Sequence, residues 1–121
     1  MRVLVTGSRD WSNPDLVIAA LEAEAVGDPK MVVVHGGNGA GVDAIADRWA
    51  TERGITVEVH PARWNEEGKR AGPLRNERMV RKGADLCLAF IRDHSRGAED
   101  CARRAQAAGI LTNIYREGEQ A

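Results

Sequence analysis

Four segments of this 121-residue chain carry residues whose types and spacing suit the binding of an anion. They read GSRD from Gly7, HGGNGAGVD from His35, HPARWNEEGKRAGPLRN from His60 and RDHSRGAED from Arg92. Glycines let a ligand approach the backbone, and an arginine guanidinium binds phosphate through two parallel hydrogen bonds. The chemistry that these segments favour is recognition of a phosphate-bearing ligand.

The segment HGGNGAGVD is the richest in glycine. Gly36 and Gly37 suit a positive φ, and Gly39 and Gly41 lead into a predicted helix whose free N–H groups suit an anion. Asp43, in the first turn, either accepts hydrogen bonds from ribose hydroxyls or complements the helix dipole. The G-x-G-x-x-A offset matches a dinucleotide fingerprint but follows the second predicted strand, so it is weak alone. A glycine turn with a capping aspartate remains the alternative.

Arginines in the other segments could reach a phosphate. Arg9 directly follows the first predicted strand, and Arg75 lies near the start of a predicted helix beside Asn76, which could read a base edge or a hydroxyl. Arg96 lies in a serine–glycine turn that begins another helix, a second N-terminus of the anion-binding kind. The alternative for each arginine is a solvated surface side chain.

Five short runs rich in apolar and β-branched residues predict strands. They cover residues 2–6, 31–35, 55–59, 85–91 and 110–115. Helical patterns fill the gaps. The first helix is expected to begin with Asn13 as its N-cap and Pro14 as its first residue. A second helix follows Gly41, a third covers residues 72–82, and a fourth follows Gly97.

The alternation of strand and helix predicts an α/β fold: a single Rossmann-like three-layer sandwich with a mainly parallel five-stranded sheet and helices on both faces. The domain is expected over residues 1–116, with a frayed C-terminal tail at 117–121. In such sheets ligands bind at the carboxyl ends of the strands, where the four segments should converge. The connection over residues 60–72 is long enough to suggest a functional role.

Composition narrows the classes of partner. The chain has 17 basic and 18 acidic residues, so it lacks the basic surplus usual in nucleic-acid binders, and only 4% of its residues are aromatic. No apolar run is long enough to span a bilayer and no signal peptide is recognisable, so a cytoplasmic protein without a membrane partner is expected. Cys87 and Cys101 are expected as buried free thiols. No metal-ligand spacing, P-loop or hydrolase elbow is found, and no cofactor is expected.

The stretches VTGSRDW, VVHGGNGAGVDAIADRWA, HPARWNEEGKRAGPLRNERMV and AFIRDHSRGAEDCARRA together resemble the YspA-type family of the SLOG superfamily. The resemblance extends from Arg2 to about Tyr115. It implies a small Rossmann-like domain, common in bacteria and phages, that senses or binds a nucleotide or a nucleotide-derived ligand. Small SLOG-type domains often pair, so the resemblance also allows a homodimer.

Two branches of the superfamily suggest alternatives. LRNERMV is similar to a helix of the LOG-type phosphoribohydrolases, and Arg75 matches their catalytic arginine. Their phosphate-binding threonine is replaced here by Ala98, and Cys101 stands where their glutamate is expected, with Asp100 one place earlier. This departure argues against glycosidic hydrolysis. HGGNGAGVDAIADRWA is similar to the glycine-rich segment of DNA-processing protein A, which makes single-stranded nucleic-acid binding a further alternative.

The leading interpretation is a binding domain in which helix ends and arginines hold phosphate, Asp43 holds ribose, and Trp64 or the long connection covers the base. If the protein is an enzyme, its catalytic residues would be Arg75, Asp43 and Asp100, with Glu77 and Glu99 as further carboxylates. The predicted ligand-binding residues are Gly7, Ser8, Arg9, His35, Gly36, Gly37, Gly39, Gly41, Asp43, Trp64, Gly72, Arg75, Asn76, Ser95, Arg96, Gly97 and Ala98.

Overall fold

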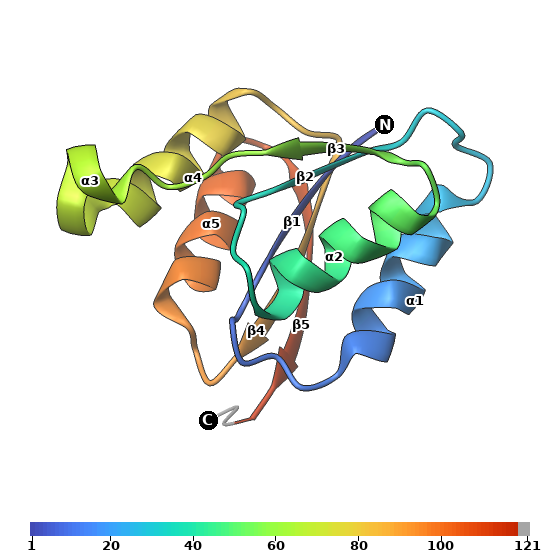
Figure 1. Cartoon of the computed structure of the whole chain (residues 1–121), viewed down its shortest axis with the longest axis horizontal. Coiled ribbons are helices and arrows are strands. Elements are labelled where there is room, and N and C mark those ends of the chain that lie inside the picture. Colours follow the sequence, from blue (N-terminus) through green and yellow to red (C-terminus); the bar gives the residue numbers. More distant parts are fainter. Residues whose placement is uncertain (119–121) are drawn as a thin grey trace.

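Five parallel strands form one sheet in the computed structural model, which describes residues 1–118 (Figure 1). They are β1 (Arg2–Gly7), β2 (Val32–His35), β3 (Thr56–Val59), β4 (Leu86–Arg92) and β5 (Leu111–Glu117). Every neighbouring pair is parallel, and the order is β3-β2-β1-β4-β5. The predicted α/β sandwich is confirmed, and the direction of chain progression reverses between β1 and β4.

Two pairs of helices cover the sheet, one pair on each face (Figure 1). The helices are α1 (Pro14–Ala25), α2 (Gly41–Glu52), α4 (Ala71–Arg81) and α5 (Arg96–Ala107). Strand side chains alternate between the faces, so Val3 packs with α1 and α2 while Leu4 packs with α4 and α5. Among the described residues, no helix has the length and apolar composition that a membrane span requires.

The start of α1 follows the predicted capping. The Asn13 side chain accepts a hydrogen bond from the Leu16 N–H at 3.3 Å, and Pro14 is the first helical residue. The proline needs no hydrogen-bond partner there, because the first N–H groups of a helix lack an intrahelical acceptor.

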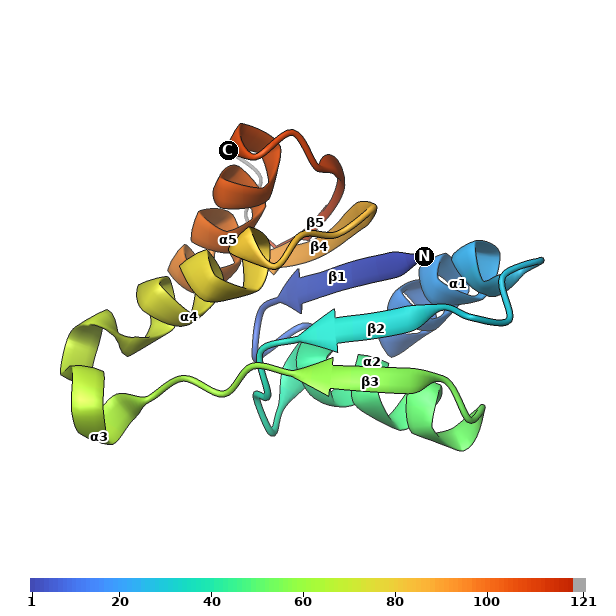
Figure 2. The same cartoon turned by 90° about the horizontal axis from the view of Figure 1, so that it is seen from above.

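The long connection after β3 contains two short helical turns that the sequence analysis did not predict. These are α3 (Trp64–Glu67) and the 3₁₀ turn η1 (Gly68–Arg70). A four-residue helix carries no readable apolar periodicity, and this one is held by Glu67, which accepts two hydrogen bonds from the Arg78 guanidinium of α4. Figure 2 shows α3 standing beyond the arrowheads of the strands, on the carboxyl side of the sheet.

The last strand, β5, ends at Glu117, which is the first residue of the tail expected at 117–121. The Glu117 carboxylate accepts hydrogen bonds from the Ser12 N–H at 2.6 Å and the Ser12 hydroxyl at 2.9 Å, and it pairs with Arg92 at 3.3 Å. These contacts fasten β5 to the loop after β1. Residues 119–121 of the expected tail lie outside the described part of the chain.

Both cysteines are buried and free, as expected. Burial raises the pKa of the Cys87 thiol to about 12 and that of the Cys101 thiol to about 11. Thiols with pKa values this high are poor nucleophiles, because they are almost entirely protonated at neutral pH.

A charged cluster on β3 makes stability depend on pH. Glu58 accepts hydrogen bonds from both terminal nitrogens of Arg2 at 2.9 Å and from His60 Nε2 at 2.6 Å. Arg2, followed by His60, lowers the pKa of Glu58 from 4.5 to about 2. Because the folded-state pKa is depressed, this stabilisation is present above pH 4.5 and is lost as the pH falls toward 2.

Glu58→Gln is therefore expected to cost about 1 kcal/mol of unfolding free energy at neutral pH, and less as the pH falls from 4.5 toward 2. Urea denaturation of both proteins at several pH values measures the gap. Glu66→Gln is the matched control, because the exposed Glu66 carboxylate has no partner within residues 1–118 and should give no gap at any pH. A wild-type-to-variant gap that is independent of pH would contradict the role of the Glu58 charge.

Candidate functional site

A cavity of about 810 Å³ lies at the carboxyl edge of the sheet, beside the point between β1 and β4 where strand order reverses. Its walls come from the loop after β1, the segment after β2, the α3–α4 region and the turn between β4 and α5. The four segments meet there, as the topology predicts. The cavity is therefore the candidate ligand site of the domain.

Most of the predicted ligand-binding residues line this cavity. They are Gly7, Arg9, Gly36, Asp43, Trp64, Gly72, Arg75, Asn76, Ser95, Arg96, Gly97 and Ala98, and Asp100 and Glu99 of the catalytic alternative join them. The other predicted residues do not line it, namely Ser8, His35, Gly37, Gly39, Gly41 and Glu77. The role predicted for each of these residues at a ligand stays a prediction, both for those that line the cavity and for those that do not.

One N–H group at the N-terminus of α2 is already hydrogen-bonded within the protein. The Val42 N–H donates to the Ser8 carbonyl at 3.3 Å, so it is not free for an anion. Gly41 has φ +68° and lies so close to the backbone of Ser8 and Arg9 that a Cβ would collide with it. The glycine at this position allows α2 to pack against the loop after β1, and the anion site expected at this helix N-terminus stays a prediction.

Ser8 and His35 fasten neighbouring loops. The Ser8 hydroxyl accepts from the Arg92 N–H at 2.8 Å, which joins the ends of β1 and β4. His35 Nδ1 accepts from the Gly37 N–H at 2.9 Å, so its proton is on Nε2, which donates to Asp47 at 2.7 Å. Both side chains are buried and fully engaged, which fits a structural role.

Asp43 is the acidic group that the glycine-rich segment brings to the cavity. Its carboxylate is buried and accepts a hydrogen bond from the Asn38 N–H at 3.2 Å. Burial raises the pKa of Asp43 above its ordinary value, while the Asn38 N–H and the charge of Arg75 act in the opposite direction. A carboxyl group in this setting is ready to accept a hydrogen bond from a ligand hydroxyl.

Arg75 and Asn76 connect three walls of the cavity. Arg75 donates to the Gly36 carbonyl at 2.5 Å and to Asn76 Oδ1 at 2.9 Å. The Asn76 amide nitrogen donates to the Gly97 carbonyl at 3.2 Å and to Asp100 at 3.0 Å. The polar atoms of Asn76 are thus hydrogen-bonded within the protein, where they connect Arg75 to the start of α5, and the predicted contact of Asn76 with a ligand stays a prediction.

The carboxylates of α5 are held by arginines. Asp100 accepts from Arg103 at 2.7 Å and from Arg104 at 2.9 Å, and Glu99 accepts two hydrogen bonds from Arg116 at 2.9 and 3.1 Å. The Arg116 hydrogen bonds lower the pKa of Glu99. With its pKa lowered in this way, Glu99 is a poor proton donor.

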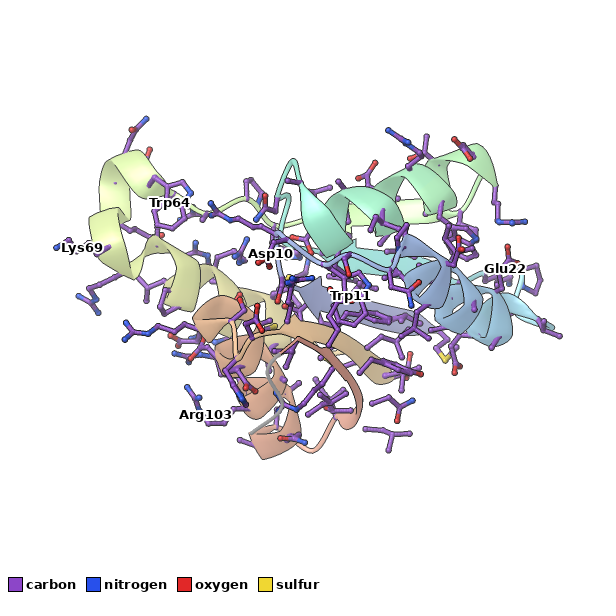
Figure 3. All side chains as sticks on the ribbon, turned by 90° about the horizontal axis from the view of Figure 1, so that it is seen from below. Asp10, Trp11, Glu22, Trp64, Lys69 and Arg103 are labelled. Carbon is purple, nitrogen blue, oxygen red and sulfur yellow. The ribbon has the colours of Figure 1, made fainter. Side chains whose placement is uncertain are left out.

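Two cations and one helix end are free to meet a ligand. The exposed guanidinium groups of Arg9 and Arg96 have no hydrogen-bond or ion-pair partner within residues 1–118. Ser95, the N-cap of α5, makes no side-chain capping bond. Trp64 is 54% exposed and projects from α3 toward the body of the domain, and Asp10 lies in the loop after β1 (Figure 3).

Sequence reasoning missed part of the lining, namely Thr6, Asp10, Asn38, Pro73, Met79, Arg92, Asp93, His94 and Arg103. Most of these belong to the four segments or adjoin them, so their position after a strand was a usable signal. Met79 lies four residues after Arg75 and shares its helix face, which periodicity could have shown. Asp93 and His94 have positive φ values of 50° and 55°, a conformation no sequence signal indicated.

The fold and the cavity at its carboxyl edge define a Rossmann-like α/β domain with a candidate ligand site. The model of the YspA, cpYpsA-related SLOG family matches residues 1–66, and the chain belongs to this family. The chain is also 51% identical over 115 residues to the Gene 61 protein of Mycobacterium phage D29, an alignment that covers 90% of this chain and 91% of the phage protein. No solved structure shows a significant match.

Proposed function

We propose that this protein binds a small nucleotide-like ligand in the cavity at the carboxyl edge of its sheet. The observation that carries the proposal is that the N-terminus of α5, which has no side-chain cap, and the unpaired guanidinium groups of Arg9 and Arg96 lie around one cavity. Free N–H groups and guanidinium groups are the donors that phosphate prefers. Membership of the SLOG family, which suggests nucleotide-related binding or processing, supports the same conclusion.

The remaining walls suit the other parts of a nucleotide. The buried carboxyl of Asp43 can accept hydrogen bonds from ribose hydroxyls. The exposed indole of Trp64 offers a flat face on which a base can stack. In this arrangement phosphate lies at the start of α5, ribose near α2 and the base under α3.

The side chains favour binding over glycosidic cleavage. Asp100 and Glu99, which would stabilise a ribosyl cation or activate water, are each held by arginines. Cys101, at the position where the hydrolase resemblance expects a glutamate, is fully buried in the core under α5. The proposal is therefore a binding or sensing domain.

Arg96→Ala is expected to weaken ligand binding by about tenfold to a hundredfold, the value of one charge-assisted hydrogen bond to phosphate. Calorimetric titration with nucleoside mono- and diphosphates and ADP-ribose measures the loss. Arg48→Ala is the matched control, because Arg48 is also an exposed arginine but lies on α2, outside this cavity. Equal losses in the two variants would indicate a general charge effect and would contradict a phosphate contact at Arg96.

The titration needs a second readout that locates the ligand. Trp11 and Trp49 are buried and Trp64 is exposed, so iodide quenching of fluorescence reports chiefly on Trp64. A bound base should shield Trp64 from iodide, whereas ribose 5-phosphate should not. The proposal would be overturned if the folded protein bound none of the nucleotides. Chromatographic detection of free base would show that the protein cleaves the nucleotide and does not only bind it.

A further inference from the structure

A second cavity, of about 630 Å³, lies between α1, α2 and the loop after β1. On α1 its wall is formed by Pro14 and Ile18, which are one helical turn apart and therefore lie on the same side of the helix. On α2 the wall begins with Ala44 and Ile45. Cavities of this size hold small molecules. Within residues 1–118, Arg9 is the one residue that lines both this cavity and the candidate site described above, so the two cavities are distinct.

Two tryptophans give the second cavity an apolar floor. Trp11 is 6% exposed and Trp49 is 4% exposed. The Trp11 indole N–H donates to the Asn13 carbonyl at 2.7 Å, and the Trp49 indole N–H donates to the Glu22 carboxylate at 3.1 Å. Glu22 also pairs with Arg53, whose guanidinium carbon lies 5.3 Å from the centre of the Trp49 ring. Because both indole N–H groups are engaged, the floor offers a ligand apolar surface whose orientation is already fixed.

Unpaired positive charge lies at the rim of this cavity. The exposed guanidinium groups of Arg9 and Arg48 have no hydrogen-bond or ion-pair partner in the part of the chain that the structure describes. Among the described lining residues, Glu52 carries the one carboxylate, against three arginines. An apolar floor beneath unpaired guanidinium groups is complementary to a molecule that has an apolar body and an anionic end.

We propose that the second cavity binds a small amphipathic anion. The apolar body of this ligand covers the partly exposed side chains of Ile18 and Ile45, and the removal of this apolar surface from water favours binding. The guanidinium groups of Arg9 and Arg48 bind the anionic end, which stays near the solvent. The proposal does not depend on the nucleotide-like ligand, because the Arg48 side chain and the apolar residues belong to the second cavity alone.

Octanoate, octylammonium and acetate separate the two parts of the expected ligand in a test on the full chain. Octanoate has an apolar chain and a carboxylate, octylammonium has a similar chain with a positive charge, and acetate has a carboxylate with almost no chain. In calorimetric titration, octanoate should bind about tenfold more tightly than either other probe. Equal affinities for octanoate and octylammonium would contradict the role of the arginines.

Arg48→Ala should weaken octanoate binding about tenfold, the value of one charge-assisted hydrogen bond to the carboxylate. Because the Arg48 side chain is exposed and has no partner within residues 1–118, the variant should fold as the wild type does, which circular dichroism checks. Arg96→Ala is the matched control, since Arg96 is an exposed arginine that lines only the first cavity, and it should leave octanoate binding unchanged.

The indole N–H signals in nuclear magnetic resonance spectra locate the bound probe. Trp11 and Trp49 line the second cavity, whereas Trp64 lines the first and lies apart from Trp11 in Figure 3. Octanoate should shift the signals of Trp11 and Trp49 and leave that of Trp64 in place. The proposal would be overturned if octanoate did not bind, if it shifted only the Trp64 signal, or if it bound folded Arg48→Ala as tightly as the wild type.

Discussion

Gly41→Ala is expected to lower the unfolding free energy by about 2–5 kcal/mol. Part of the cost arises because alanine must adopt the φ of +68° that glycine tolerates. The rest arises because the new Cβ would overlap the backbone of Ser8 and Arg9, which cannot rotate aside as a flexible side chain can. Urea or thermal denaturation measures the change.

Gly39→Ala is the control for this prediction. Gly39 lies two residues earlier in the same loop, its Cβ would meet no atom within 4 Å, and its φ lies outside the left-handed region. The change should stay within about 0.5 kcal/mol. A Gly41→Ala protein with wild-type stability but no ligand binding would contradict the packing role and would restore the glycine segment as a ligand cradle.

The alternation of apolar runs and helical patterns was enough to predict the sheet, the four long helices and the edge of the sheet at which the cavity lies. These features follow from periodicity and from the handedness of parallel crossovers, which are local or general properties. The short α3 could not be predicted, because its stability comes from the contact between Glu67 and Arg78 across the connection. A contact between elements leaves no periodic signal in the sequence.

The candidate site was predicted at the level of segments and not at the level of side chains. The sequence of the glycine-rich segment could not show that the Ser8 carbonyl occupies the N-terminus of α2. Nor could it show that the Ser95 side chain makes no capping hydrogen bond at the start of α5. Residue type indicated which groups could bind phosphate, whereas packing decided which of them were already engaged.

The junction of α4 and α5 depends on one buried amide, and Asn76→Ala is expected to lower the unfolding free energy by about 2–3 kcal/mol. Asn76 is only 3% exposed. Without its side chain the Gly97 carbonyl loses a donor, and Arg75 loses the acceptor that orients its guanidinium. We also expect about tenfold weaker ligand binding, because Arg75 and the start of α5 are no longer held in place. Denaturation and calorimetric titration measure the two effects.

Asn76→Asp separates the hydrogen bonds from the packing, because aspartate has nearly the same shape. Its second oxygen would replace the amide nitrogen that donates to the Gly97 carbonyl and to Asp100, so two carboxylates would face each other. This variant should be at least as unstable as Asn76→Ala at neutral pH and should regain stability as the pH falls and the new carboxylate is protonated. Asn65→Ala, at an exposed position of α3, should change neither stability nor binding. The amide is oriented by its partners, because the Gly97 carbonyl and the Asp100 carboxylate accept from its nitrogen while Arg75 donates to its oxygen. Wild-type stability of Asn76→Asp at neutral pH would contradict this orientation.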